Sequence, residues 1–533
     1  MIRINEIKLP LDCDEKTELT EAAASALGID KRNIRNTEIY KKSIDSRRKN
    51  DIKFVFAVDV EIDGDEEALL KRLSNPKIIG VKKYSYALPE NRRSSALRPV
   101  VVGFGPAGML CSLMLSKAGL KPLVIERGRS VYERTDDVKK FWQDRVLDEN
   151  SNVQFGEGGA GTFSDGKLTT GIKDPRIREV FIQLCRHGAP EEIMYSALPH
   201  IGTDRLKGVV ESIRKDVISL GGEFRFGTCL TDIIVYNKSV QGITVRKPDG
   251  TSEDLETDTV ILAIGHSARD TVEMLYRKGI PMLQKPFSVG ARIEHRQDMI
   301  NKTQYGVFHN HPKLQAASYK LACHPDGGRG AYTFCMCPGG TVVCASSEKD
   351  TVVTNGMSEY ARDKENANSA LLVGIETSDF PSDHPLAGMY WQRELERKAF
   401  LLGGGDYSAP AQLVGDFLND RPSHGAGAVK PSFPTGVKYT NLRSLLPERT
   451  VNVMSQALVK MNRMLDGFSQ PEAVLTAPET RSSAPVRIVR DEFMQTVVRG
   501  LYPCGEGAGY AGGIVSAAVD GIKAAEAVLG DER

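Results

Sequence analysis

Residues 98–128 read RPVVVGFGPAGMLCSLMLSKAGLKPLVIERG, and this stretch decides the expected fold of the chain. The apolar run VVV predicts a short strand. Gly103, Gly105 and Gly108 follow it at GxGxxG spacing, before a predicted helix of small residues. In such a unit the first glycine permits a tight turn, the second lets backbone approach a diphosphate, and the third packs helix against strand. The stretch therefore favours a dinucleotide-binding turn over a purely structural glycine turn.

The same stretch ends in a second predicted strand, LVI, which stops at Glu126. An acidic residue at this place is expected to accept hydrogen bonds from the ribose hydroxyls of an adenosine. Strand, glycines, helix and acid thus occur in the order that a βαβ nucleotide-binding unit requires. This stretch alone does not distinguish FAD from NAD.

The composition is that of an ordinary globular protein. The 533 residues suggest two or three domains, with 41% hydrophobic and 26% charged residues. A net charge of +1 provides no overall attraction to nucleic acid or to a membrane surface. No apolar run is long enough to span a bilayer, and the segment MIRINEIKLP lacks the uninterrupted apolar core of a signal peptide. We therefore expect a cytoplasmic protein without a membrane span.

Nine cysteines, an odd number, favour reduced thiols over a disulfide framework. Cys335 and Cys337 form a CxC within TFCMCPGG, whereas CxxC zinc pairs and the CxxxxC of flavin disulfide reductases do not occur. Residues two apart on a strand share a face, so we interpret this pair as small buried side chains. Neither a metal site nor a redox-active disulfide is expected.

Residues 1–95 predict a separate α+β domain with the order strand, helix, strand, strand, helix, strand, which is that of a ferredoxin-like module. Its predicted hairpin turn carries Arg47, Arg48 and Lys49. Such a basic patch could contact RNA, yet the strands lack an aromatic pair for base stacking. A solvated hairpin is therefore the favoured interpretation. The polar segment 91–96 is interpreted as a linker.

A glycine-rich run, NVQFGEGGAGTFSDGKL at 152–168, follows a predicted charged helix. Gly158, Gly159 and Gly161 allow positive φ and expose backbone amides, which suits a loop close to a cofactor. Interleaved apolar residues favour this interpretation over a flexible surface loop.

The run 259–264 predicts a buried strand that returns to the central sheet and stops at Gly265, which is expected to lie near the adenine side of the cofactor. Residues from 267 to 475 carry no nucleotide-binding pattern and predict an inserted domain. Three glycines at 403–405 follow a predicted helix, so we interpret them as a helix cap and turn.

The C-terminal stretch 499–521, RGLYPCGEGAGYAGGIVSAAVDG, indicates which dinucleotide is bound. It predicts a short strand, then Gly505 and Glu506, then more glycines and a helix from about Ile514. A second glycine-rich strand end favours FAD over NAD, because the flavin half of FAD extends beyond the first βαβ unit. Glu506 is expected to bind the ribitol hydroxyls, and the helix N-terminus to face the flavin N1/O2 edge.

With both glycine motifs placed, the chain resembles the two-dinucleotide-binding-domain flavoproteins, and more closely a poorly characterised family of bacterial and plastid FAD-dependent dehydrogenases. Glu506 departs from the Asp that is usual in flavoenzymes. The usual Glu-x6-Lys/Arg continuation is absent, since Glu133 holds its last position and Arg134 comes one residue late. The stretches that carry the resemblance are VVVGFGPAGM, QFGEGGAGTFSDGKL, TFCMCPGG, VTNGMSEYARDKENANSALLVGI, PSFPTGVKYTNL, ETRSSAPVRI and PCGEGAGYAGGIVSAAVDG.

The resemblance implies an α/β fold in which an FAD-binding Rossmann-like domain of the glutathione-reductase type carries an inserted α+β substrate or cap domain. The expected division is an N-terminal ferredoxin-like domain at 1–95, the first part of the FAD-binding domain at 96–266, the cap domain at 267–475, and the second part of the FAD-binding domain at 476–533.

The function expected from these features is that of an FAD-dependent oxidoreductase, a dehydrogenase or reductase that transfers a hydride at flavin N5 to or from an unidentified small molecule. NADH or NADPH is expected as a transient electron donor. Two alternatives stay open, an RNA-associated or tRNA-modifying flavoprotein and a noncatalytic FAD-binding module. The sequence does not determine the oligomeric state.

The expected site residues fall into two groups, candidate catalytic residues and candidate cofactor-binding residues. Among the candidate catalytic residues, Arg481 and Ser482 could stabilise an anionic substrate or the flavin O2 edge. Alternatively, Arg481 could form an ion pair that fixes a turn. The candidate catalytic residues are Arg292, His295, Arg481 and Ser482. The candidate cofactor-binding residues are Gly103, Gly105, Pro106, Ala107, Gly108, Glu126, Arg127, Gly158, Gly159, Gly161, Gly265, Gly505, Glu506, Gly512, Gly513 and Ile514.

Overall fold

The computed structural model describes residues 1–325 and 328–531. The strand that precedes the GxGxxG turn, β5, lies in the middle of a five-stranded parallel sheet with the order β23-β11-β5-β6-β7. Four of these strands are buried triplets without a charged residue, as expected of parallel strands covered on both faces. The strands are β5 (Val100–Val102), β6 (Leu123–Ile125), β7 (Glu223–Arg225), β11 (Val260–Leu262) and β23 (Leu501–Pro503).

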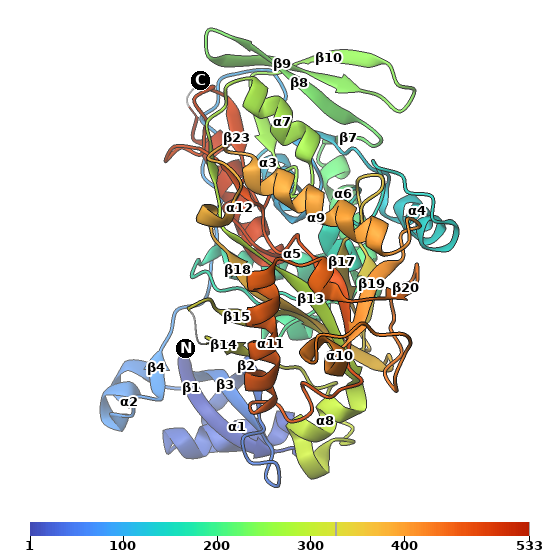
Figure 1. Ribbon diagram of the computed structural model, residues 1–533. Helices are drawn as coiled ribbons and strands as arrows, with labels where there is room; N and C mark the ends of the chain where they lie inside the picture. Colours follow the sequence, from blue (N-terminus) through green and yellow to red (C-terminus); the bar gives the residue numbers. More distant parts are fainter. Residues whose placement is uncertain (326–327, 532–533) are drawn as a thin grey trace.

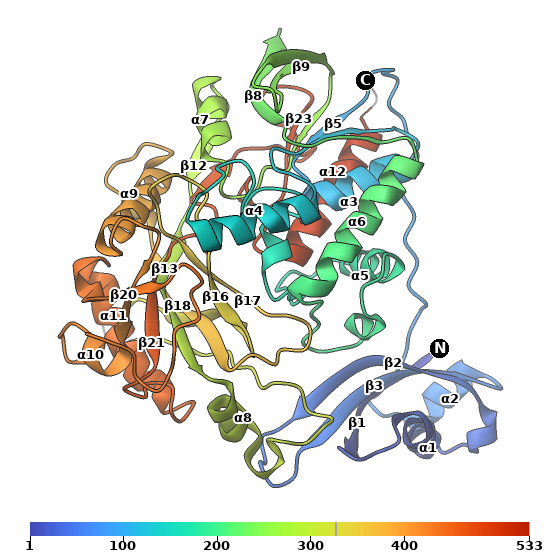
Figure 2. The same cartoon turned by 90° about the vertical axis from the view of Figure 1, so that its right-hand side faces the viewer.

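Different elements cover the two faces of this sheet. Because successive strand residues point to opposite faces, Val101 packs into the core under four helices. Val100 and Val102 pack on the other side, against a three-stranded antiparallel sheet and one helix. Figure 2 shows α3, α6 and α12 together on one side of the sheet. The covering elements are α3 (Pro106–Lys117), α5 (Arg176–Arg186), α6 (Thr203–Ser219) and α12 (Ile514–Leu529), and β8 (Cys229–Tyr236), β9 (Ser239–Arg246), β10 (Ser252–Glu256) and α7 (Arg269–Arg277).

The strand predicted at 259–264 is β11, which returns to the parallel sheet between β5 and β23. The predicted C-terminal strand is β23, and the predicted helix after it begins at Ile514. The segments that carry the two glycine motifs therefore meet in one sheet, as predicted.

A second sheet has seven strands in the order β14-β15-β18-β13-β21-β19-β20. Its long central strands β13 and β18 are almost completely buried, and helices pack on it through a continuous apolar core. Its strands are β13 (Phe287–Arg296), β14 (Ala322–Cys323), β15 (Ala331–Cys337), β18 (Asn366–Ile375), β19 (Ala409–Leu413), β20 (Val437–Tyr439) and β21 (Val474–Glu479). The helices are α8 (Gln297–Tyr305), α9 (Ala387–Leu402), α10 (Val414–Leu418) and α11 (Glu448–Asn462).

Two short antiparallel strand pairs lie outside the larger sheets. The chain leaves the parallel sheet through β12 (Met282–Gln284) and returns through β22 (Val486–Ile488), which pair with each other. A second pair, β16 (Thr341–Cys344) and β17 (Thr354–Met357), belongs to the intervening segment. The seven-stranded sheet is thus built entirely from the chain between β12 and β22.

The N-terminal segment forms its own four-stranded sheet in the order β2-β3-β1-β4, with the predicted succession of strands and helices. The strand expected to run from Ile78 to Tyr84 is shorter and ends at Gly80. This sheet and the β8–β10 sheet lie at opposite ends of the molecule (Figures 1 and 2). The elements are β1 (Ile2–Pro10), α1 (Glu15–Leu27), β2 (Ile34–Asp45), β3 (Lys53–Ile62), α2 (Glu66–Leu73) and β4 (Ile78–Gly80).

The charged helix expected after Glu126 is α4 (Val131–Asp144), which begins with a capping box formed by Ser130 and Glu133. Gly403 caps α9, as predicted for the three-glycine run.

None of the helices in the described part of the chain combines the length and apolar content that crossing a bilayer requires. Short 3-10 segments are η1 (Lys31–Asn33), η2 (Ala160–Phe163), η3 (Glu191–Met194), η4 (Gly306–Phe308), η5 (Thr377–Asp379) and η6 (Leu442–Ser444).

Candidate functional site

A cavity of about 800 Å³ lies where the carboxyl ends of the parallel strands meet the seven-stranded sheet. The last residues of β5 and β6 line it, and so do the turns that follow β11 and β23. In open parallel sheets, ligands bind at such strand ends where neighbouring connections diverge to opposite faces. The cavity is therefore the candidate functional site.

The GxGxxG turn forms one wall of this cavity. Gly103 has a φ of 94°, which only glycine adopts readily. A Cβ atom on Gly108 would overlap the backbone oxygen of Gly103, so a side chain there would push α3 away from β5. Gly105, Pro106 and Ala107 line the cavity, and α3 begins at Pro106. The free amides of a helix N-terminus thus face the cavity, as an anion-binding turn requires.

Glu126 and Arg127 also line the cavity. The Glu126 carboxylate accepts hydrogen bonds from the backbone amides of Phe104 at 2.9 Å, Gly128 at 2.9 Å and Gly156 at 3.0 Å. Glu126 therefore joins the glycine turn to the glycine-rich loop, a role that the sequence did not predict. Arg127 is held against Asp270 by two hydrogen bonds of 3.0 and 2.9 Å.

The glycine-rich loop 152–168 packs directly on the GxGxxG turn. A Cβ atom on Gly159 would lie 2.9 Å from the Cα atom of Gly105, a separation that real Cβ atoms essentially never show. Gly159 and Gly161 line the cavity, whereas Gly158 lies behind its wall, where a Cβ atom would meet Thr162. The loop is thus part of the cavity wall, and the glycines permit the close approach of two backbones.

Arg134 of α4 holds this loop in place. Its side chain is completely buried and donates hydrogen bonds of 2.8 to 3.2 Å to five backbone carbonyl oxygens, those of residues 152, 153, 156, 157 and 159. Burial lowers the pKa of Arg134 to about 10, so the guanidinium stays charged at neutral pH. The residue that departs from the usual Glu-x6-Lys/Arg spacing is therefore the one that organises the loop.

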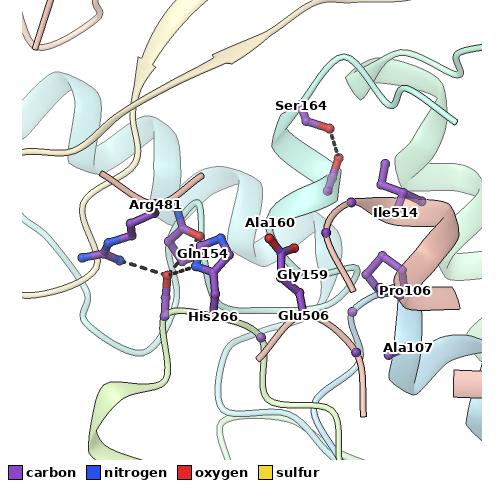
Figure 3. A pocket seen from close by; sticks show the side chains of 18 of the residues that line it. Pro106, Ala107, Gln154, Gly159, Ala160, Ser164, His266, Arg481, Glu506 and Ile514 are labelled. Atoms are coloured by element: carbon purple, nitrogen blue, oxygen red, sulfur yellow. Dashed lines mark hydrogen bonds between the residues drawn. The ribbon is translucent and has the colours of Figure 1, made fainter. Parts of the chain in front are cut away.

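The C-terminal glycine segment forms the facing wall. The backbone amide of Gly505 donates to Asp520 of α12 at 2.7 Å, and Arg490 holds the same carboxylate with two hydrogen bonds. Glu506 projects into the cavity, and burial raises its pKa to about 7, although the charge of Lys285 and an amide hydrogen bond oppose this shift. Figure 3 shows Glu506 between His266 and Arg481 on one side and Pro106 and Ile514 on the other.

The turn after β11 contributes a hydrogen-bonded group that the sequence analysis missed. Ser267 Oγ lies 2.9 Å from His266 Nδ1, donates to Gln154 Oε1 at 3.3 Å and accepts from Arg481 Nη1 at 3.0 Å (Figure 3). Burial and the positive charges of Arg481 and Arg269 lower the pKa of His266 to about 3. A neutral imidazole therefore lies next to Gly265 in the cavity wall.

Arg481 lines the cavity, but its charge is already paired. It donates to both carboxylate oxygens of Glu396 at 3.0 and 2.8 Å, and to Ser347 Oγ at 2.5 Å. Although burial acts in the opposite direction, Arg269 and Arg481 hold the pKa of Glu396 well below its usual value. This geometry agrees with the ion-pair interpretation, while one edge of the guanidinium remains part of the cavity wall.

The other three candidate catalytic residues have different surroundings. Ser482 lines the cavity, but its hydroxyl donates to the Ser288 carbonyl oxygen at 2.8 Å and accepts from the Ser288 amide. Arg292 lies behind the lining, fully buried and paired with Glu479 at 2.9 and 3.0 Å. His295 does not line the cavity.

His295 is fully buried, although it lies near the end of a strand. The strand β13 runs through the middle of the seven-stranded sheet, so its last residues remain covered. The ring nitrogen Nε2 lies 2.8 Å from the Phe468 carbonyl oxygen, and burial lowers the pKa of His295 to about 4. A neutral, structural imidazole fits these contacts.

The remaining predicted cofactor-binding residues Gly265, Gly512, Gly513 and Ile514 line the cavity. The basic hairpin residues Arg47, Arg48 and Lys49 are exposed and do not line it, and Arg47 pairs with Asp45 at 2.6 Å.

Among the described residues no group of His, Cys, Asp or Glu could hold a metal ion. All nine cysteines are free thiols, as predicted.

Two residues of the site were not predicted from the sequence, namely Arg134 and His266. His266 follows Gly265 directly, so the end of a predicted strand of the parallel sheet was a sufficient signal for it. No local pattern identified Arg134, because its hydrogen bonds depend on how the loop folds back over α4.

The parallel sheet, the glycine turn and the cavity at the strand ends define an α/β protein of the Rossmann type. Residues 286–482 match the family described as FAD-dependent protein, C-terminal domain-like. Residues 1–61 match a domain of unknown function, DUF8436. An uncharacterized protein of Clostridium beijerinckii is 48% identical over 531 residues, which cover 99% of this chain and 98% of that protein. The chain therefore belongs to one family with this clostridial protein.

Solved structures show more distant similarity. The glycerol-3-phosphate dehydrogenase from Bacillus halodurans complexed with FAD is 12% identical, with a TM-score of 0.36, over 82% of this chain and 65% of that chain. A flavoprotein/dehydrogenase from Cytophaga hutchinsonii is 12% identical, with a TM-score of 0.37, over 82% and 80% of the two chains. Similarity at this level carries no inference about activity.

Proposed function

We propose that this protein is an FAD-dependent oxidoreductase that binds the cofactor across the cavity. The observation that carries the proposal is that two glycine-rich segments from distant parts of the chain line the same cavity, each at the carboxyl end of a strand of one sheet. A mononucleotide needs one such segment, whereas an extended dinucleotide contacts both. The matched family of FAD-dependent proteins supports the choice of FAD.

The residues at the cavity fit the parts of FAD. The N-terminus of α3 and the close approach of Gly105 to Gly159 leave bare backbone amides where the diphosphate would bind. Glu126, Arg127 and Gly265 would surround the adenosine. Glu506 would accept hydrogen bonds from the ribitol hydroxyls, which lie next to the diphosphate along the cofactor.

Bound FAD would supply a hydride acceptor or donor at its N5 atom. The chain itself would position this group and exclude water. The N-terminus of α12, at Gly513 and Ile514, provides partial positive charge in the cavity wall. His266 is neutral at physiological pH and offers a hydrogen bond without a charge, while Arg481 keeps Ser267 oriented. The substrate is a small molecule that enters next to the seven-stranded sheet.

We further propose the domain division given above, with a ferredoxin-like domain at 1–95, an FAD-binding domain in two parts at 96–266 and 476–533, and a cap domain at 267–475. The pairing of β12 with β22 supports an insertion, because it brings together the two ends of the intervening segment. NADH or NADPH is proposed as a visiting electron donor.

A visible spectrum of the purified full-length protein tests the proposal. We expect flavin absorption, release of FAD rather than FMN on denaturation, and bleaching on anaerobic titration with NADH or NADPH. A colourless protein that fails to bind added FAD would refute FAD binding. Bound FAD that only dithionite reduces would refute the oxidoreductase and favour a noncatalytic FAD-binding module.

A further inference from the structure

Two cysteines lie where the seven-stranded sheet closes the cavity. Strand β15 pairs regularly with β18 as far as Phe334 and resumes at Cys337, with a bulge between them. Cys335 occupies this bulge with a φ of 44°, lines the cavity and is partly exposed, whereas Cys337 is fully buried. The alternation expected from the sequence is broken by the bulge, so the two thiols do not share one buried environment.

Positive charges surround this pair. The ammonium group of Lys167, in the glycine-rich loop, is buried and has no hydrogen-bond partner among the described residues. Its Nζ atom forms an ion pair with Asp165 Oδ2 at 3.5 Å, and Asp165 is itself bound by Arg362. On the other side, Arg292 Nη1 donates to the Cys335 carbonyl oxygen at 2.9 Å and lies 4.0 Å from Cys337 Sγ. Lys167 is thus a cation with a shared carboxylate and no hydrogen-bond acceptor among the described residues, and it lines the same cavity as Cys335.

The pKa values of the two thiols are shifted in opposite directions. The Cys337 thiol donates a hydrogen bond to the Cys335 carbonyl oxygen at 3.2 Å. The neighbouring Cys337 thiol, helped by the charges of Lys167 and Arg292 and opposed by burial, holds the pKa of Cys335 well below its usual value. The same pairing and burial raise the pKa of Cys337. Burial also raises the pKa of each of the other seven cysteines, which are Cys13, Cys111, Cys185, Cys229, Cys323, Cys344 and Cys504. A partly exposed thiol with a lowered pKa, which lines the cavity, and a buried thiol with a raised pKa therefore lie two residues apart.

From this arrangement we infer that Cys335 and Cys337 form a redox-active dithiol that opens onto the cavity and exchanges with small-molecule disulfides. Cys335 is the attacking thiolate and Cys337 the resolving thiol. A nucleophilic thiolate needs access and a stabilising cation, which the cavity and Lys167 provide. The inference concerns the thiols alone and does not depend on the proposed cofactor.

The reaction balances without any further oxidant. The Cys335 sulfur attacks one sulfur of the disulfide R–S–S–R, the S–S bond breaks, and the first thiol R–SH leaves. The Cys337 sulfur then attacks the Cys335 sulfur, the mixed disulfide breaks, and the second R–SH leaves. The small molecule gains two electrons and two protons, and the two cysteines lose them and form an intrachain disulfide.

The test uses 2,2′-dithiodipyridine, an uncharged disulfide, with the full-length native protein. We expect a rapid release of two thiopyridone molecules per chain and a protein mass lower by two hydrogens, with no pyridyl adduct. Cys337→Ser should release one molecule rapidly and retain one adduct on Cys335. Cys335→Ser should lose the rapid phase. A wild-type protein that stops at the mixed disulfide, or whose Cys335 reacts no faster than the other cysteines, would overturn the inference.

The Lys167→Met variant tests whether Cys335 reacts rapidly because the Lys167 charge stabilises its thiolate, or only because the disulfide reagent can reach it. The rate at neutral pH should fall about tenfold or more, because the thiolate fraction falls as the thiol pKa rises. Lys438→Met is the control, since Lys438 is exposed and does not line the cavity, and it should leave the rate unchanged. Equal rates in the Lys167→Met and wild-type proteins, with equal unfolding temperatures, would contradict the role of Lys167. The rapid phase should persist in cofactor-free protein, so failure of FAD binding and failure of this inference are distinguishable.

Discussion

Gly105 and Glu506 line one cavity, although one follows the first strand of the nucleotide-binding part of the chain and the other its last. They meet because β5 and β23 lie on either side of β11, and all three strands run parallel. Parallel neighbours end at the same edge of a sheet, so the turns after them must approach each other. Placement of these residues on opposite sides of the molecule would have refuted the proposed cofactor site.

Gly108→Ala should abolish cofactor retention. The added Cβ atom would overlap the Gly103 carbonyl oxygen, and α3 would have to move away from the strand that carries the turn. Gly208→Ala is the matched control, because Gly208 lies on an exposed turn of α6 with no atom within 4 Å of the new Cβ. The flavin content per chain after gel filtration measures the difference. Full flavin content in Gly108→Ala would contradict the proposed position of the diphosphate.

Arg134→Met should destabilise the protein by roughly 3 to 5 kcal/mol, because it leaves five carbonyl oxygens without their buried donor. Arg129→Met is the control, since Arg129 is exposed and forms an ion pair with Asp137 at 3.2 Å. That change should cost about 1 kcal/mol or less. Urea unfolding measures both values. Similar losses in the two variants would show that Arg134 does not hold the loop.

Glu506→Ala should weaken FAD binding about tenfold to a hundredfold, the usual range for losing a hydrogen bond to a charged acceptor. Glu506→Gln keeps an acceptor oxygen and should lose less. Glu492→Ala is the control, because Glu492 is an exposed acid that does not line the cavity, and it should have no effect. Fluorescence quenching of added FAD by the cofactor-free proteins measures the affinities. Unchanged affinity in Glu506→Ala would place the ribitol elsewhere.

The stability of the protein should fall as the pH drops from about 6.5 toward 4, in part because of His295. Its pKa of about 4 in the folded state lies below the ordinary histidine value of about 6.5, so the unfolded chain binds the extra proton first. At pH 5 this difference amounts to roughly 2 kcal/mol relative to pH 7.5. His295→Gln should show a flatter pH dependence in urea unfolding. Parallel pH profiles for the two proteins would exclude this contribution.

Much of the fold followed from local patterns. The apolar triplets, the glycines after them and the helix of small residues predicted the βαβ unit. The same signals at the C-terminus predicted the last strand and the helix that begins at Ile514. The N-terminal succession of strands and helices was predicted correctly, because hydrophobic periodicity and turn residues are properties of short segments.

Properties that depend on distant packing could not be predicted in this way. Arg134 fell outside the expected spacing, yet it binds the glycine-rich loop, because the loop folds back over α4. His295 lies near the end of a strand, yet it is buried because that strand runs through the middle of a seven-stranded sheet. A bulge in β15 separates Cys335 from Cys337, and bulges arise from pairing with a partner strand.

The sequence by itself determined the backbone of the site, because glycine spacing restricts φ and ψ locally and an apolar strand end is readable from a few residues. Only the tertiary structure decided which charged and polar side chains are paired and which face the cavity. Arg481 and Arg292 are compensated by Glu396 and Glu479, whereas Lys167 has no hydrogen-bond acceptor among the described residues. Such pairing depends on contacts between segments hundreds of residues apart, and no local pattern records it.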